Sequence, residues 1–257
     1  MKLTADFHTH TIFSHGKGTI LENAMVAKEK GLKQIAITDH GFSHPAFRIS
    51  HKKLPVMKKL CKEAEIQTGV KVLLGIESNI LGLRGKTDLK AEDYFNFDIF
   101  LAGIHKFILY DGINEWFSLY GANLIARLKD KPSNNLIKRN TQIYINTIKN
   151  NPIDILAHPN YCFYADIVEV AKCCRDYGTY FEINARKTYL SDDEWDKIAS
   201  TGVKFVIDSD AHDPNVVGQI DNAISMVERV NINKNQIVNI DGSYPSSFRF
   251  NEFKKNL

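Results

Sequence analysis

The sequence repeats one pattern seven times. A short apolar run, rich in β-branched or aromatic residues, leads directly into a polar side chain and then into a segment with helical periodicity. The runs cover residues 2–7, 34–38, 71–76, 98–104, 154–157, 179–183 and 203–207. Near-continuous apolar strands separated by helices are typical of a parallel sheet covered on both faces. The chain is therefore predicted to be an α/β protein.

The intervening segments predict helices at residues 19–30, 55–68, 133–149, 166–177, 191–200 and 215–230. Each chemically rich residue follows the carboxyl end of a strand, and a closed βα barrel brings all these ends together on one face. In an open sheet the outermost strands would lie too far apart. We therefore predict a distorted (βα)7 TIM-like barrel that forms a single domain over residues 1–257.

Two segments depart from the pattern. Residues 106–132 are too long for a median loop and carry Trp116 and neighbouring aromatics, which predicts a lid, an interface or an extra helix. The chain after Asn231 has no strand of its own, and we expect it to wrap around the barrel and to end in a frayed tail from about residue 240.

Composition excludes several classes of protein. The net charge is +3, from 33 Lys and Arg against 30 Asp and Glu, without a long basic block, so we do not expect a nucleic-acid partner. No apolar run approaches the ~20 residues that span a bilayer, and we expect a cytoplasmic protein without a membrane partner. The four cysteines have no metal or redox spacing and are expected to be reduced.

The residues at the strand ends share the ability to bind metal ions. They are His8, His10, His15, His40, Glu77, His105, His158, Asp210 and His212. A single histidine of this kind is more often an ordinary polar residue, but the set includes seven of the nine histidines in the chain. Imidazole combined with carboxylate suits Zn, Mn or Fe better than Mg or Ca.

The first strand illustrates how ligands would converge. In an extended segment His8 and His10 project to the same side, and His15 returns from the following loop. Nine ligands exceed the need of one ion, so we expect two or three ions close together. Such a site suits hydrolysis by a metal-activated hydroxide, with the ions stabilising the attacking and leaving oxygens.

These residues lie in motifs that resemble those of the PHP (polymerase and histidinol phosphatase) superfamily. The motifs are HTHTIFSHG at 8–16, ITDHG at 37–41, GIES at 75–78, GIH at 103–105, AHPN at 157–160, FEIN at 181–184 and SDAH at 209–212. The sequence looks most like the stand-alone bacterial branch of trinuclear-metal phosphoesterases, and the resemblance extends from residue 3 to about 240.

The resemblance implies a barrel with three metal ions and a phosphatase-type reaction. By position, one ion would be held by His8, His10 and Asp210. A second would be held by His15, His40 and His212. A third would be held by His105 and His158, with Glu77 bridging. His15 stands where many relatives have Asp.

We therefore predict a metal-dependent phosphoesterase that hydrolyses a small phosphomonoester, as a histidinol phosphatase does. The residues predicted to act in catalysis are Glu77, Asp210, His212 and Arg186. The alternatives are a nucleotide phosphatase or 3′–5′ exonuclease, an enzyme that cleaves amides or lactones, and a non-catalytic metal-binding protein. The sequence leaves the substrate, the metal and the oligomeric state open.

Other polar residues near the strand ends have two interpretations. Asp6, Asp39 and Asp208 could either orient imidazole N–H groups or cap the strand ends. Arg186 could grip a phosphate with its planar guanidinium or be a solvated surface residue. Further candidates in the loops are Lys106, Arg48, His44, His51 and Arg84.

Overall fold

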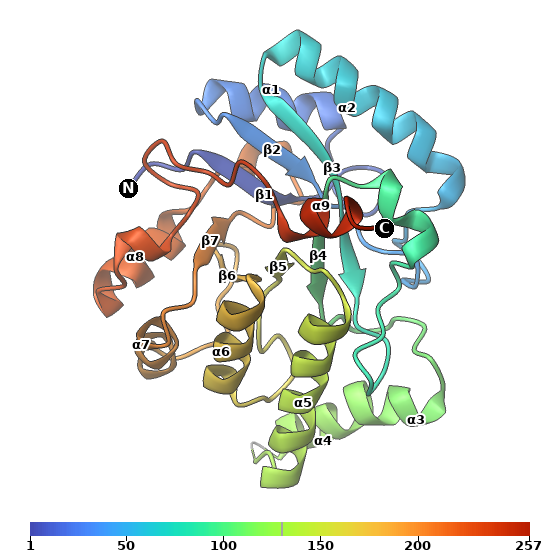
Figure 1. The fold of residues 1–257 in the computed structure, drawn as a ribbon, viewed down its shortest axis with the longest axis vertical. Helices are drawn as coiled ribbons and strands as arrows, with labels where there is room; N and C mark the ends of the chain where they lie inside the picture. The colour runs from blue at the N-terminus through green and yellow to red at the C-terminus, as the bar shows by residue number, and fades with distance from the viewer. Residues whose placement is uncertain (130) are drawn as a thin grey trace.

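A computed structural model describes residues 1–129 and 131–257, and its centre is one sheet of seven parallel strands in chain order (Figure 1). The strands are β1 (Ala5–Thr9), β2 (Gln34–Ile37), β3 (Lys71–Asn79), β4 (Ile99–Gly103), β5 (Ile155–Leu156), β6 (Tyr180–Asn184) and β7 (Phe205–Asp208). All seven coincide with the predicted apolar runs to within a few residues. The prediction of an α/β fold is confirmed.

The sheet closes almost completely into a barrel, because β7 returns to β1. Thr9 and Ala211 form a parallel bridge, and the backbone N–H of His10 donates to the carbonyl of Ala211 at 2.8 Å. These contacts lie at the end of the barrel where the strands finish. The prediction of a distorted seven-stranded TIM-like barrel in a single domain is confirmed.

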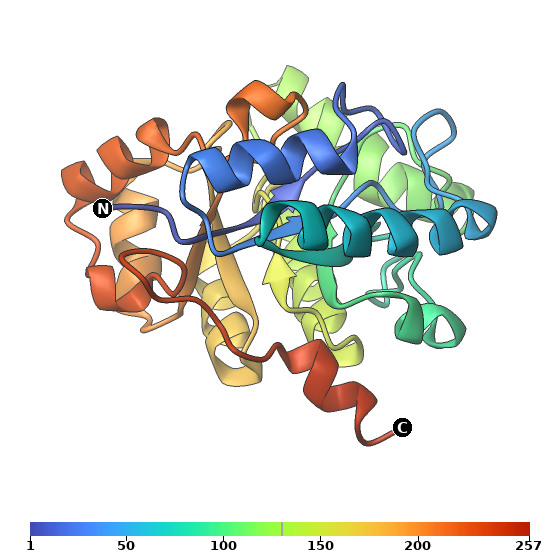
Figure 2. The ribbon, with the colours of Figure 1, turned by 90° about the horizontal axis from the view of Figure 1, so that it is seen from above.

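Helices surround the barrel, and α1 and α2 lie side by side along it (Figure 2). The long helices are α1 (Ile20–Glu29), α2 (Leu54–Thr68), α5 (Asn134–Asn150), α6 (Ile167–Tyr177), α7 (Asp192–Ser200) and α8 (Asp221–Val230). Local signals fix their ends. The Thr19 side chain and Glu22 form a capping box before α1, and Gly69 ends α2 at φ 73°.

The helix predicted over residues 215–230 is divided into two pieces. A short 3₁₀ turn, η4 (Pro214–Val216), comes first, and α8 begins only at Asp221. Between them Gly218 adopts φ 65°, a left-handed conformation that interrupts a helix. The Gly218 N–H donates to the buried carboxylate of Asp6 at 2.9 Å, which holds this break against the first strand.

The insertion over residues 106–132 is largely helical. It contains α3 (Ile113–Trp116), the π-helical turn η3 (Phe117–Gly121) and α4 (Ala122–Leu128), while residue 130 lies outside the described part of the chain. The remaining short turns are η1 (His51–Lys53), η2 (Ala91–Asn96) and η5 (Lys234–Gln236). The function of the insertion as a lid or an interface stays a prediction.

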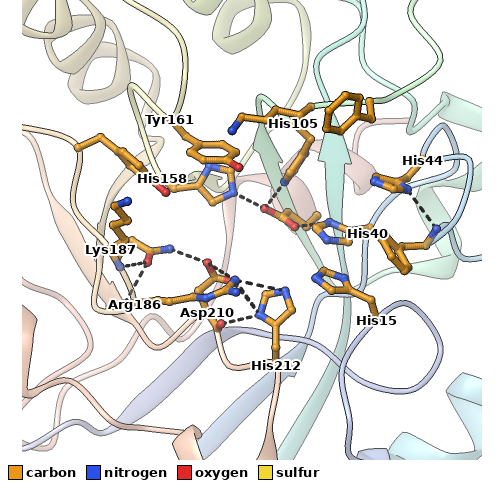
Figure 3. A pocket seen from close by; sticks show the side chains of 16 residues that line it. His15, His40, His44, His105, His158, Tyr161, Arg186, Lys187, Asp210 and His212 are labelled. Atoms are coloured by element: carbon orange, nitrogen blue, oxygen red, sulfur yellow. Dashed lines mark hydrogen bonds and ion pairs between the residues drawn. The ribbon is translucent and has the colours of Figure 1, made fainter. Parts of the chain in front are cut away.

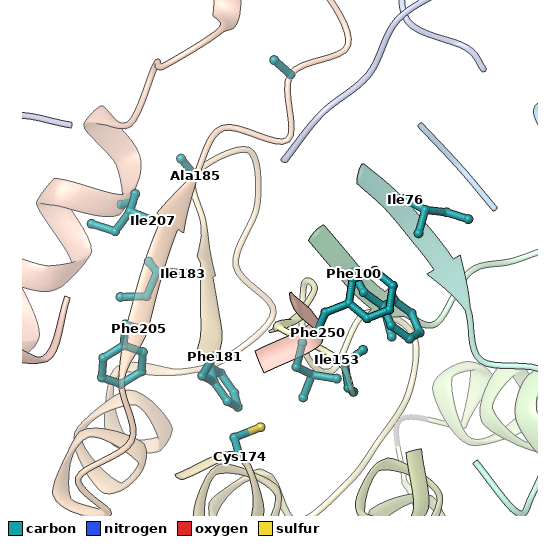
Figure 4. Close-up of a cluster of buried hydrophobic side chains, with 14 of the residues drawn as sticks. Ile76, Phe100, Ile153, Cys174, Phe181, Ile183, Ala185, Phe205, Ile207 and Phe250 are labelled. Carbon is teal, nitrogen blue, oxygen red and sulfur yellow. The ribbon is translucent and has the colours of Figure 1, made fainter. Parts of the chain in front are cut away.

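Two apolar cores hold the layers together. The larger one lies between sheet and helices and includes Phe181, Ile183, Phe205 and Ile207 (Figure 4). The smaller one fills the barrel near the strand starts and includes Leu73 of β3. Since side chains alternate along a strand, Leu73 and Glu77 lie on the same face of β3. Along this face the apolar core is followed by charged side chains toward the end of the strand.

The C-terminal segment wraps around the barrel as expected, but the prediction that it frays is wrong. It ends in α9 (Arg249–Lys254), which lies across the end of the barrel where the strands begin (Figure 1). Phe250 is fully buried, and the ring of Phe248 meets Phe7 edge to face at a centroid distance of 5.2 Å. Burial of these two aromatic rings outweighs the polar character of the tail.

Asn239 closes the gap that remains between β1 and β7 at the strand starts. Its Nδ2 donates to the carbonyls of Ala5 at 2.9 Å and of Ile207 at 2.7 Å, and its Oδ1 accepts from the Ile207 N–H at 2.9 Å. The side chain therefore replaces the backbone of a missing strand, and it is fully buried.

We expect Asn239→Ala to lower the free energy of unfolding by about 2–4 kcal/mol, because three buried backbone groups lose their partners. Denaturant unfolding measures the change. The exposed Asn235→Ala is the matched control, with an expected effect below about 0.5 kcal/mol. Equal stability of the two variants would contradict this account of barrel closure.

Asp154 anchors α9 from inside the protein. Its carboxylate accepts from the N–H groups of Phe250 at 2.8 Å and Phe100 at 2.9 Å. Burial raises the pKa of Asp154 to about 7. Between its ordinary pKa and this value the folded state binds more protons than the unfolded state, so its contribution to stability is present in acid and is lost as the pH rises through about 7.

We therefore expect the stability advantage of the wild type over Asp154→Asn to be larger at pH 5 than at pH 8, by ~2 kcal/mol. The measurement is denaturant unfolding of both proteins at the two pH values. Asp196→Asn, at an exposed position of α7, should show no such dependence. An Asp154→Asn difference that is the same at both pH values would contradict the raised pKa.

Candidate metal centre

The predicted ligands converge at the end of the barrel where the strands finish (Figure 3). His8 and Glu77 lie within β1 and β3, whereas the others come from the loops that directly follow strands. Both of these strands extend past the predicted ends, and they therefore include His8 and Glu77, whose side chains point into the barrel. His8, His10 and Glu77 are almost completely buried.

The ligand atoms form four overlapping groups that could each hold a metal ion. The groups are His8, His10 and Asp210; His10, His40 and His212; His8, Glu77 and His158; and His40, Glu77 and His105. His10 belongs to two groups and Glu77 to two others. Such sharing is the arrangement expected of a compact site for several ions rather than of separate sites.

Glu77 lies at the middle of the cluster. Its Oε1 is 2.9 Å from Nε2 of His105 and 2.6 Å from Nε2 of His158, and its Oε2 is 2.7 Å from Nδ1 of His40. Burial alone would raise the pKa of this carboxyl, but the surrounding imidazoles hold its pKa well below the usual range. Glu77 is therefore an ionised carboxylate with both oxygens directed at different histidines.

Burial lowers the pKa of three imidazoles of the cluster, which suits them to bind cations rather than protons, whereas at His8 and His158 the facing carboxylates outweigh burial and raise the pKa. Burial lowers the pKa of His10 well below its ordinary value, that of His40 to about 4 and that of His15 to about 3. Both ring nitrogens of His10 and the Nε2 of His8 are buried without a hydrogen-bond partner. Since buried polar atoms are normally paired, these unpartnered nitrogens and the nearby carboxylates fit metal ions well.

Glu182 contacts two of the predicted ligands, but it was not among the site residues predicted from the sequence. It lies in β6, is completely buried, and its Oε1 accepts from Nδ1–H of His8 at 2.6 Å. Its Oε2 accepts from the backbone N–H of His158 at 2.5 Å. A charged residue in an otherwise apolar strand was the available signal, because a buried carboxylate needs a partner.

The contact with Glu182 determines which nitrogen of His8 is free. With the proton on Nδ1, the lone pair of Nε2 points toward Glu77 and Asp210, at 3.3 and 3.7 Å. Carboxylates that orient metal-binding histidines in this way are common in metalloproteins.

His15 is placed differently from the other predicted ligands. Its ring stacks on His40 with centroids 4.7 Å apart and an interplanar angle of 6°. The four groups of converging ligand atoms do not include it, and His10 instead joins His40 and His212. Its centroid is nevertheless 4.2 Å from that of His212, and its function as a ligand stays a prediction.

The aspartates next to the ligands contact hydroxyl and backbone groups. Asp39 accepts from the hydroxyl and N–H of Thr11, and Asp6 accepts from the hydroxyl and N–H of Ser209. Asp208 accepts from the N–H of Phe7 at 2.7 Å. Of the two interpretations left open by the sequence, these contacts support capping of the strand ends.

The backbone is strained where two of the ligands sit. His158 has φ 29° and Asp210 has φ 50°, values that residues other than glycine rarely adopt. Beside them, a Cβ on Gly103 would come within 2.7 Å of Cε1 of His158. The surrounding structure thus stabilises an otherwise unfavourable backbone in order to place these side chains, as is common at functional sites.

Six of the eight converging ligands line an open pocket of about 480 Å³, whereas His8 and His10 are buried and do not line it. Arg186, an exposed residue after β6, lines it, and its Nη1 is 3.1 Å from Nδ1 of His212 and 3.6 Å from Oδ2 of Asp210. Lys106 and His44 also line the pocket. The volume is typical of a site for a small molecule.

A family model described as the PHP domain matches residues 6–186 of the chain. The chain belongs to the PHP domain family. A relative from Caldanaerobacter subterraneus subsp. tengcongensis, named a probable phosphatase, is 33% identical, and the match covers 93% of this chain and 88% of the relative. One from Thermoanaerobacter sp. strain X514, with the same description, is also 33% identical and covers 94% and 92%.

Among solved structures, this chain is similar to histidinol phosphate phosphatase from Lactococcus lactis subsp. lactis, which was crystallised with zinc, L-histidinol and phosphate. The TM-score is 0.58 at 18% identity, over 90% of this chain and 95% of that one. This likeness shows a shared fold. The predicted family and its barrel are confirmed, and the relatives named probable phosphatases agree with the predicted phosphoric ester hydrolase.

We expect Glu182→Gln to weaken metal binding by this PHP domain about 10- to 100-fold. The amide would place an N–H against Nδ1 of His8 or lose that contact, so the proton would move to Nε2 and block the ligand atom. Competition with a chelator measures the affinity. The exposed Glu169→Gln on α6 is the control, and equal affinities of the two variants would contradict the orienting function of Glu182.

Proposed function

We propose that this protein hydrolyses a small phosphomonoester and that it holds three divalent ions of zinc, manganese or iron in the pocket described above. The observation that carries the proposal is the convergence of eight ligand residues from six strand ends, and six of these residues line a pocket of about 480 Å³. No helix in the described part of the chain has the length and apolar character needed to cross a membrane.

The ions would be held by the predicted ligands, eight of which fall into the four converging groups. One would be bound by His8, His10 and Asp210, a second by His40 and His212 with His10 or His15, and a third by His105 and His158. Glu77 would bridge. When bound, such ions make water nucleophilic near neutral pH and stabilise negative charge on phosphate oxygens.

Arg186 would bind the phosphate of the substrate. Its guanidinium is half-exposed at the edge of the cluster, and its planar shape matches two phosphate oxygens in a bidentate contact. The loop that carries it is ordered by Asn184, whose Oδ1 accepts from the N–H groups of Arg186 and Lys187, both at 3.1 Å. Asn184 would thus position the two cations that follow it.

The shape of the pocket supports a small substrate. Its walls come from the loops after the strands, and its volume lies in the range of small-molecule sites. A nuclease would need a basic groove with stacking aromatics that follows a polynucleotide. Ester hydrolysis at one terminal phosphate agrees better with a single compact cluster.

We expect His10→Ala to lose bound metal and to reduce phosphate release from p-nitrophenyl phosphate on the order of 10³-fold, because His10 belongs to two of the ligand groups. Elemental analysis and a phosphate assay measure both effects. His51→Ala is the control, since His51 pairs with Asp93 outside the cluster. Full activity of the His10→Ala protein would refute the proposed mechanism.

A further inference from the structure

Apart from the predicted metal ligands, the charged side chains that line the pocket are positive. Of the described residues that line it, the acidic ones are Glu77 and Asp210, and both belong to the cluster. Lys106, Arg186 and Lys187 contribute three cations to the wall. The outer part of the pocket therefore has cationic side chains that can pair with an anionic group of a ligand. Among its described residues it has no carboxylate that could pair with an ammonium group of a ligand.

The two lysines stand apart from the arginine. Arg186 reaches the cluster itself, with Nη1 3.1 Å from His212. The Nζ of Lys106 instead lies 5.3 Å from the ring centroid of Tyr161, and the Nζ of Lys187 lies 5.3 Å from that of Tyr189. In Figure 3 Lys187 is on the side of the pocket with Tyr161 and His158, opposite His15 and His44.

Two tyrosines in contact with one another each have a lysine over the ring, although the two lysines follow different strands. The rings of Tyr161 and Tyr189 are in contact, with centroids 5.0 Å apart, and each carries one ammonium group. Cation–π contacts of this kind restrict flexible lysine side chains. The result is a second positive centre, supported by aromatic rings, beside the place where a phosphate would meet the ions.

We propose that the substrate carries a second anionic group, a carboxylate or another phosphate, and that Lys106 and Lys187 bind it. The tyrosine rings would pack against the part of the substrate between its two anionic groups. The inference rests on the proposed function and specifies its substrate class. It also disfavours esters with an ammonium group, such as histidinol phosphate, which would meet two lysines and no carboxylate.

A matched series of three-carbon esters tests the proposal on the metal-loaded, full-length protein. The esters are propyl phosphate, 3-aminopropyl phosphate, 3-(phosphonooxy)propanoate and propane-1,3-diyl bisphosphate. We expect kcat/KM for the last two to exceed that for propyl phosphate about 10- to 100-fold, the range of one or two charge-assisted hydrogen bonds. The better of these two identifies the second group as carboxylate or phosphate.

Charge reversal makes the test independent of overall activity. In Lys187→Glu the preference should invert, so that 3-aminopropyl phosphate has a higher kcat/KM than 3-(phosphonooxy)propanoate. Lys187→Met should reduce the preference toward one and keeps the test decisive if the glutamate variant does not fold. Lys62→Glu, the same change at an exposed position of α2, should keep the wild-type preference.

The outcomes separate the inference from the proposed function. Similar kcat/KM values for all four esters, or an unchanged preference in Lys187→Glu, would overturn the second anion site while phosphate release still supports the phosphatase. If the metal-loaded protein released no phosphate from any of the four esters, the proposed function would fail and this inference with it.

Discussion

The site depends on one constraint, the return of β7 to β1. The bridge between Thr9 and Ala211 places His8 and His10 at the beginning of the chain next to Asp210 and His212 near its other end. Without this closure the first and last strands would be the two edges of an open sheet. At the opposite end of the barrel Asn239 supplies the hydrogen bonds that a further strand would have supplied. Closure of the barrel is therefore what brings the ligands from the first and last strands together.

A second physical requirement follows from placing a charged cluster inside a barrel. Burial disfavours both the ionised Glu77 and protonated imidazoles, and the contacts among them determine which charge survives. The carboxylate stays ionised because histidines surround it, and His40 keeps a low pKa and hence a free lone pair. Glu182 accepts a hydrogen bond from Nδ1 of His8 and so determines which ring nitrogen of His8 carries the proton. These groups are arranged so that added positive charge from metal ions would be favourable.

Much of this could be predicted from the sequence, because strands, helices and strand-end ligands leave local patterns. The seven apolar runs predicted the strands, and the recurrence of histidine after them predicted the site. What was missed depends on contacts between distant residues. Glu182 lies within a predicted strand, but its partner is 174 positions away, and Asn239 lies in a segment without periodicity. The burial of Phe250 could not be predicted from a tail that is polar on average.

The central claim is that the cluster binds several metal ions and uses them to hydrolyse phosphomonoesters. The most direct test is elemental analysis of the freshly purified protein, combined with phosphate release before and after chelation. The account predicts close to three transition-metal ions per chain, with activity lost on chelation and restored by zinc or manganese. A protein that binds no metal even after reconstitution, or that releases phosphate equally well after its metal is removed, would contradict it.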